Sequence, residues 1–275
     1  MGLQQAADTL GVHYMTAYRY VRTGRLRARR HAGRWVIAAS DLAPFMDATP
    51  HPGSPRRRAA PDASGARVSH TTRLLDRLLA GDEAGAWHVV ESALVGGMGP
   101  DRAHVELLAP CLRDIGERWA AGTVTVGAEH IASATAGRVA ARLGPLCARR
   151  GRTLGTIVLG APPDEHHGLP MTLLTNVLRS RGWHVVELGP DTPPSDMIAA
   201  AATADRLAAV GVSVGSDSAL TRAEGVLAEL REHVAGVPLL AGGPAVPDLA
   251  TAHGLGADRW GADGDQVHAA VTGGP

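Results

Sequence analysis

The sequence predicts a multidomain protein of α and α/β architecture, in which a winged helix-turn-helix and a four-helix bundle precede a flavodoxin-like, doubly wound parallel sheet. Three observations support this prediction. Two short helical segments and a basic hairpin come first, four helical segments joined by glycine-containing turns follow, and apolar strands alternate with helices from Thr153 onward. With 45% hydrophobic residues, the 275-residue chain can bury several cores.

Residues 1–47 are predicted to form the winged helix-turn-helix. The helical segments LQQAADTLG and HYMTAYRYVRTG end at Gly11 and Gly24, and RLRARRHAGRWVIAASDL alternates toward a strand pair that turns near residues 32–33. All 27 basic residues are arginine and 27 acidic residues balance them, but residues 1–67 hold 11 arginines against 4 aspartates. This local positive charge indicates an acidic partner.

The segments of residues 1–47 resemble the small winged helix-turn-helix domains of the MerR and excisionase type. The resemblance implies that the second helix enters the major groove of double-stranded DNA and that the wing holds the phosphate backbone. The residues it assigns to DNA contacts are Tyr14, Thr16, Ala17 and Arg19 on the helix and Arg27, Arg29, Arg30 and Arg34 on the wing. A basic module that binds protein is the alternative.

Residues 48–68 separate this domain from the rest of the chain. They are rich in Pro, Gly, Ser and Arg and have almost no bulky apolar residue, so they predict a mobile linker. The arginines at positions 56–58 are either phosphate contacts or a solvated charge run.

Residues 69–150 predict a four-helix bundle. The helical segments are SHTTRLLDRLLAG, DEAGAWHVVESALVGG, DRAHVELLAPCLRDIGERWAAG and GAEHIASATAGRVAARLGPLCARR. Their short, glycine-containing joints predict antiparallel neighbours.

Cysteine content and hydropathy limit the class of protein. Cys111 and Cys147 are far apart and lack C-x-x-C spacing, so they predict neither a disulfide framework nor a zinc site. No apolar run approaches the length of a membrane span, and the N-terminus lacks the basic start and apolar core of a signal peptide. We therefore expect a cytoplasmic protein without a membrane partner.

Residues 151–275 predict the doubly wound parallel sheet. Its strands are TIVLGA, HVVELG, AAVGVSV, PLLAGG and a weaker ADRWGA. Ligands bind open α/β sheets at the carboxyl ends of the strands. The loop APPDEHHGLPM, which follows the first strand with several ionisable side chains, is therefore a candidate site, and a solvated loop is the alternative.

This loop resembles the D/E-x-H-x-x-G pattern of cobalamin-binding modules, which also place a helical bundle before an α/β domain. The resemblance implies that His167 is the lower axial ligand to the cobalt of cobalamin and that Glu165 orients its imidazole. Pro170 stands where glycine is commonest in the family.

The loops after the next three strands extend the resemblance. The resemblance implies that the nucleotide tail of cobalamin contacts Asp191, Thr192, Ser213, Gly242 and Gly243. Ser216 belongs to the same loop as Ser213. Gly215 departs from the pattern, because many relatives have an apolar residue there. Ordinary turn chemistry is the alternative reading of the glycines.

A second motif, RWAAGTVTVGAEH, lies in the bundle. It resembles the W-x9-E-H pattern of the CarH/LitR family of cobalamin-dependent photoreceptor repressors, with Trp119, Val126, Glu129 and His130 in place. The resemblance implies that these residues cap the upper face of adenosylcobalamin. Family members with a stable light-state adduct have a histidine directly after the tryptophan, where this chain has Ala120.

The resemblance implies a light-responsive transcriptional regulator, expected to be a repressor and a homo-oligomer, dimer or tetramer, and not a conventional enzyme. Two alternatives stay open: a corrinoid protein that carries methyl groups for a methyltransferase system, and a regulator that senses cobalamin or another tetrapyrrole without photochemistry. The sequence shows no P-loop, nucleophile elbow or metal-ligand cluster that would indicate a rival enzyme.

Overall fold

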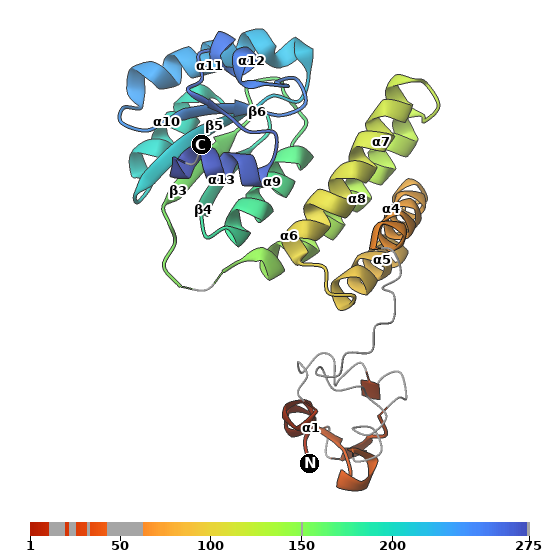
Figure 1. Ribbon diagram of the computed structural model, residues 1–275. Coiled ribbons are helices and arrows are strands. Elements are labelled where there is room, and N and C mark those ends of the chain that lie inside the picture. The colour runs from red at the N-terminus through yellow and green to blue at the C-terminus, as the bar shows by residue number, and fades with distance from the viewer. Residues whose placement is uncertain (11–19, 22–25, 32–33, 43–62, 150, 274–275) are drawn as a thin grey trace. The chain divides into compact units, whose positions relative to one another are not determined.

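The computed structural model describes residues 1–10, 20–21, 26–31, 34–42, 63–149 and 151–273 (Figure 1). The chain divides into two compact units, Met1–Ala60 and Pro61–Pro275, and each is described by itself.

The N-terminal unit contains a helix and a hairpin. Helix α1 is Leu3–Thr9, and β1 (Arg29–His31) pairs antiparallel with β2 (Arg34–Val36), as the alternation of the sequence predicted. Ala6, Leu26 and Ile37 are buried in a small core. The predicted second helix falls largely outside the described residues.

The second unit begins with the helical bundle. Its elements are α4 (Ala63–Leu79), α5 (Glu83–Val95), α6 (Pro100–Ala103), η1 (His104–Leu108), α7 (Ala109–Ala120) and α8 (Val126–Cys147). Elements α6, η1 and α7 form one continuous helical run, so four long helices pack together as predicted (Figure 1). Helix α4 begins inside the segment that the sequence predicted to be linker.

A π-helical turn interrupts the third bundle helix, where the sequence predicted a regular helix. Pro110 has no N–H to donate to the carbonyl of Glu106, so the α-helical ladder cannot be complete here. The turn widens instead, Ala109 N–H donates to His104 O, and the Thr71 hydroxyl lies 3.5 Å from Glu106 O. The proline is thus accommodated without ending the helix.

The rest of the unit is a doubly wound α/β domain. Its elements are β3 (Thr156–Gly160), α9 (Leu169–Ser180), β4 (His184–Gly189), α10 (Pro194–Thr203), β5 (Leu207–Ser213), η2 (Asp217–Ala219), α11 (Leu220–His233), β6 (Leu239–Gly242), α12 (Leu249–Gly254), β7 (Arg259–Trp260) and α13 (Gly264–Thr272). The strands are parallel in the order β4-β3-β5-β6-β7, which confirms the flavodoxin-like prediction.

Alternate residues of the strands face opposite sides of the sheet. Ile157 and Leu159 pack with α9 and α13 on one face, and Val158 packs with α10 and α11 on the other. Both faces are therefore covered, as the nearly unbroken apolar strands predicted. No described helix is both long and apolar enough to cross a membrane.

Helix α8 packs parallel to α9 and joins the bundle to the sheet. A Cβ on Gly137 would lie 4.0 Å from Leu169 Cδ1, and farther along both helices Asn176 Nδ2 donates to Ala140 O at 3.3 Å. Because Leu169 begins α9, the part of α8 before Gly137 extends beyond α9 on the carboxyl side of the sheet. His130 lies seven residues before Gly137, about 10 Å along the helix axis.

Arg181 makes a second connection between the bundle and the sheet domain. Its guanidinium donates to Asp101 of α6 at 2.7 Å and to Asp265 of α13 at 2.6 Å. The Arg181 and Asp101 side chains are mostly shielded from water, so this contact is screened less than a surface ion pair.

We predict that Arg181→Met lowers the free energy of unfolding by about 1 kcal/mol, because two carboxylates lose their partner. Arg102→Met is the control, since Arg102 pairs with Glu106 within one helical run at an exposed position. Its effect should stay within about 0.5 kcal/mol. Urea unfolding measures both, and equal losses would contradict the bridging role of Arg181.

Candidate functional site

Glu165 lies in the loop after β3 and is almost fully buried, with 1% of its side chain exposed. Five groups surround its carboxylate. His167 N–H and His167 Nδ1 lie 3.0 and 2.5 Å from Oε1, and the N–H groups of Gly215 and Ser216 donate to Oε2 at 2.9 and 3.0 Å. The Ser216 hydroxyl adds a contact at 3.1 Å. A buried carboxylate needs such partners, and this one has them on both oxygens.

The imidazole of His167 is oriented by this carboxylate. A carboxylate can only accept, so Nδ1 carries the proton in their contact and the lone pair of the neutral ring is on Nε2. The ring is otherwise open, with 64% of the side chain exposed. The arrangement therefore presents an oriented nitrogen donor at the carboxyl ends of the strands.

The hydrogen bonds also keep Glu165 ionised. Burial works to raise the pKa of Glu165, but the N–H and ring of His167 and the hydroxyl of Ser216 outweigh it and hold the pKa below its usual value. The carboxylate is thus charged when it faces the imidazole, and its contact with Nδ1 holds the ring in one orientation.

The loop after β4 fastens the His167 loop. Asp164 N–H donates to Asp191 Oδ1, and Asp191 N–H donates to Glu165 O, both at 2.9 Å. Asp164 and Asp191 have φ of 59° and 52°, a conformation that non-glycine residues adopt mainly where surrounding contacts enforce it. Thr192 N–H donates to Ala161 O, and its hydroxyl donates to Gly189 O.

These contacts give Asp191 and Thr192 a role in the loop itself, which the sequence did not predict. Their predicted contact with a cofactor stays a prediction. The same holds for Ser213, which ends β5 half-buried.

At Gly242 and Gly243, the packing of the backbone leaves no room for a side chain. A Cβ on Gly242 would lie 2.6 Å from Gly261 O, and one on Gly243 would lie 2.4 Å from Val214 O. Both glycines are therefore required by close packing of backbone. Their contact with a nucleotide tail also stays a prediction.

Pro170, the departure from the loop pattern, fits the local structure. It lies in the first turn of α9, where a backbone N–H has no partner within the helix. The lack of an N–H on proline therefore costs little stability here.

The bundle motif gathers at the turn between α7 and α8. Gly122 takes φ of 72° after the end of α7, and the Thr125 side chain accepts from Ala128 N–H to begin α8. The end of α7, with Trp119, therefore lies next to the beginning of α8, with Val126. These two side chains are 49% and 54% exposed, although both are apolar.

Glu129 and His130 lie on the first turns of α8. Glu129 accepts from the Ser133 hydroxyl at 2.5 Å, and its other oxygen is 3.6 Å from His130 Nε2. His130 is 73% exposed. Ile131, which the sequence did not single out, adds a further exposed apolar side chain. These residues lie on the part of α8 that extends beyond the start of α9, so both predicted groups are on the carboxyl side of the sheet.

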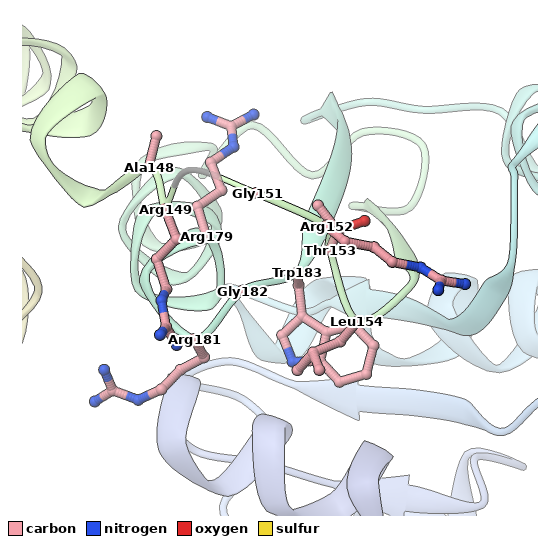
Figure 2. A pocket seen from close by; sticks show the side chains of 10 residues that line it. All are labelled: Ala148, Arg149, Gly151, Arg152, Thr153, Leu154, Arg179, Arg181, Gly182 and Trp183. Carbon is pink, nitrogen blue, oxygen red and sulfur yellow. The ribbon is translucent and has the colours of Figure 1, made fainter.

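A pocket of about 290 Å³ lies at the opposite side, near the amino ends of β3 and β4 (Figure 2). It is lined in part by Arg149, Arg152, Arg179 and Arg181. In Figure 2 the four guanidinium groups point in different directions. The pocket is therefore separate from the His167 loop and is not a convergent anion site.

The predicted DNA-binding residues are only partly described. Arg27 and Arg29 are exposed, and Arg29 lies on β1. Arg30 and Arg34 belong to the hairpin, but their side chains are outside the description. Tyr14, Thr16, Ala17 and Arg19 lie outside the described residues.

We predict that Glu165→Gln lowers the free energy of unfolding at pH 7 by about 2 kcal/mol, because an amide cannot accept from all five partners. The pKa of Glu165 is lower in the folded protein, so its contribution is complete above pH 4.5 and is lost as the pH falls through the folded-state pKa. The difference between the two proteins in urea unfolding should therefore shrink in acid. Glu224→Gln, at an exposed position of α11, should show no such difference; a gap independent of pH would contradict the prediction.

Comparison with known proteins finds similar domains along most of the chain. A helix-turn-helix domain model matches residues 1–49, and two B12 binding domain models match residues 71–143 and 155–269. The HTH-type transcriptional repressor CarH of Myxococcus xanthus is 34% identical over 194 residues, which cover 69% of this chain. The chain spans 62% of that repressor's length.

Among solved structures, the monomethylamine corrinoid protein of Methanosarcina barkeri has a similar fold. Its TM-score is 0.65 at 18% identity, over 75% of this chain and 98% of that one. At this identity the likeness shows the fold alone. By these matches, the chain is similar to B12 binding domains over two successive regions, which follow a region similar to helix-turn-helix domains.

Proposed function

We propose that the protein is a light-responsive transcriptional repressor that binds double-stranded DNA and takes adenosylcobalamin as its chromophore. The observation that carries the proposal is the His167 imidazole, which is fixed through Nδ1 on a buried carboxylate and is open at Nε2. The helix-turn-helix match and the similarity to a transcriptional repressor support the regulatory part.

The residues present fit cobalamin. A neutral imidazole nitrogen with a carboxylate behind it is a typical donor set for a transition metal. In the described part of the chain, no group of three or more His, Cys, Asp or Glu residues could hold a metal by itself. A metal that arrives inside its own macrocycle needs only the one axial donor that His167 offers.

The upper face would be covered by the bundle residues. Trp119 and Val126 present apolar surface, which otherwise lies exposed to water at an energetic cost. Glu129 and His130 add polar groups beside it. Adenosylcobalamin, when bound, supplies a cobalt–carbon bond that light breaks.

DNA recognition would use the N-terminal unit. Exposed Arg27 and Arg29 suit phosphate contacts, and the predicted recognition helix would read bases. We include a homo-oligomer, dimer or tetramer, in the proposal, because helix-turn-helix proteins commonly read paired half-sites with paired domains.

The methyl-carrier alternative shares the His167 arrangement but gives the helix-turn-helix domain no role. A regulator that senses cobalamin without photochemistry would bind DNA in a manner that depends on the cofactor but not on light. DNA binding with and without light therefore separates all three functions.

We predict that His167→Ala weakens retention of adenosylcobalamin at least about tenfold, whereas His166→Ala changes it little. Both residues are exposed and adjacent, but only His167 is oriented by Glu165. The DNA probe is double-stranded DNA selected from a random pool by the wild-type protein, loaded with adenosylcobalamin and kept in the dark. Illumination should release this DNA from the wild type and from His166→Ala.

Equal loss of cofactor in the two variants would contradict the role of His167. Failure to enrich any DNA would favour the methyl carrier. Equal DNA binding in the dark and in the light would favour a regulator that senses cobalamin without photochemistry.

We predict that the illuminated protein loses cobalamin readily, because Ala120 has no lone pair to offer the upper face. Ala120 is exposed at the end of α7, and Ala120→His should slow the loss at least about tenfold by adding a donor there. Gel filtration after illumination measures the retained cofactor.

His130 is the alternative donor in the unmodified chain. If the wild type retains cobalamin durably after light and His130→Ala abolishes this retention, His130 supplies the bond. In that outcome the argument from Ala120 is wrong.

A further inference from the structure

Gly215 lies between β5 and η2, directly against the Glu165–His167 pair. A Cβ at this position would lie 2.8 Å from His167 Cβ and 3.1 Å from both His167 Cγ and Glu165 Oε2. The first distance is shorter than real Cβ contacts allow, so a side chain at position 215 requires movement of its neighbours.

The neighbours of Gly215 have little freedom to move. His167 Cβ is attached to backbone whose N–H donates to Glu165, and Glu165 Oε2 is held by the N–H groups of Gly215 and Ser216. The loop behind Glu165 is fastened in turn by Asp191. A methyl group at position 215 would therefore displace His167 or separate the loop after β5 from the carboxylate.

The usual reason for a glycine does not apply at this position. Gly215 is not among the glycines with positive φ, so its backbone conformation is open to other residues. Gly242 and Gly243 differ, because a Cβ there would meet backbone of neighbouring loops. At Gly215 the space is needed by the side chain of His167.

We propose that Gly215 is a positioning residue for the axial imidazole of His167. Its N–H anchors Glu165 Oε2, and its missing side chain lets the ring lie close enough for Nδ1 to meet Oε1. Gly215 thereby sets the direction of Nε2 before any ligand binds. The proposal rests on the proposed function of His167 as the ligand to cobalamin.

The test uses full-length, cofactor-free protein labelled with ¹⁵N-histidine. In the wild type, NMR should show a His167 Nδ1 proton protected from exchange by Glu165. Gly215→Ala should speed this exchange at least about tenfold and weaken cobalamin binding by about tenfold. Gly225→Ala is the matched control, because Gly225 is exposed on α11 and a Cβ there meets nothing within 4 Å.

A double-mutant cycle keeps the proposal testable if Gly215→Ala folds poorly. In a His167→Gly background, the drop in Tm caused by Gly215→Ala should be much smaller, because the closest contact is gone. Unchanged Nδ1 exchange and cobalamin affinity in Gly215→Ala, or an equal drop in Tm in both backgrounds, would overturn the proposal.

The two proposals fail separately. If the wild-type Nδ1 proton is protected and Gly215→Ala exposes it, but neither protein binds cobalamin, then the positioning role holds and the proposed function is wrong.

Discussion

The contact between the Glu165 carboxylate and the His167 ring is the interaction on which the site depends. A buried, ionised carboxylate is tolerated only when donors surround it, and those donors come from its own loop and from the loop after β5. The loop after β4 holds the backbone through Asp191. Loops at three neighbouring strand ends thus hold Glu165 in place, and its carboxylate in turn fixes the imidazole.

The bundle adds the second half of the site because of how α8 and α9 pack. Their parallel contact, which includes the hydrogen bond from Asn176 to Ala140 O, fixes how far α8 extends past the start of α9. Arg181 joins the two parts at another point. Apolar side chains such as Trp119 stay exposed on that extension. Exposed apolar surface on the same side of the sheet as an oriented imidazole is what a large, largely apolar macrocycle would cover.

Sequence periodicity predicted most of the fold, since alternating strands and apolar helix faces are local features. The resemblance of the loop to cobalamin-binding modules also paired Glu165 with His167, and the structure brings these two side chains into contact. The π turn at Pro110 was missed because its accommodation depends on contact with another helix. The tight fit of Gly215 against His167 was missed because it joins residues 48 positions apart, and only the folded loops bring them together.

The central claim is that His167, through Nε2, is the lower ligand to cobalt. Its most direct test is electron paramagnetic resonance of protein labelled with ¹⁵N-histidine and loaded with the cobalt(II) form of cobalamin. We predict hyperfine coupling to a single ¹⁵N nucleus that is absent in His167→Ala. Coupling to the ¹⁴N of the cofactor's own base in the wild type would contradict the claim.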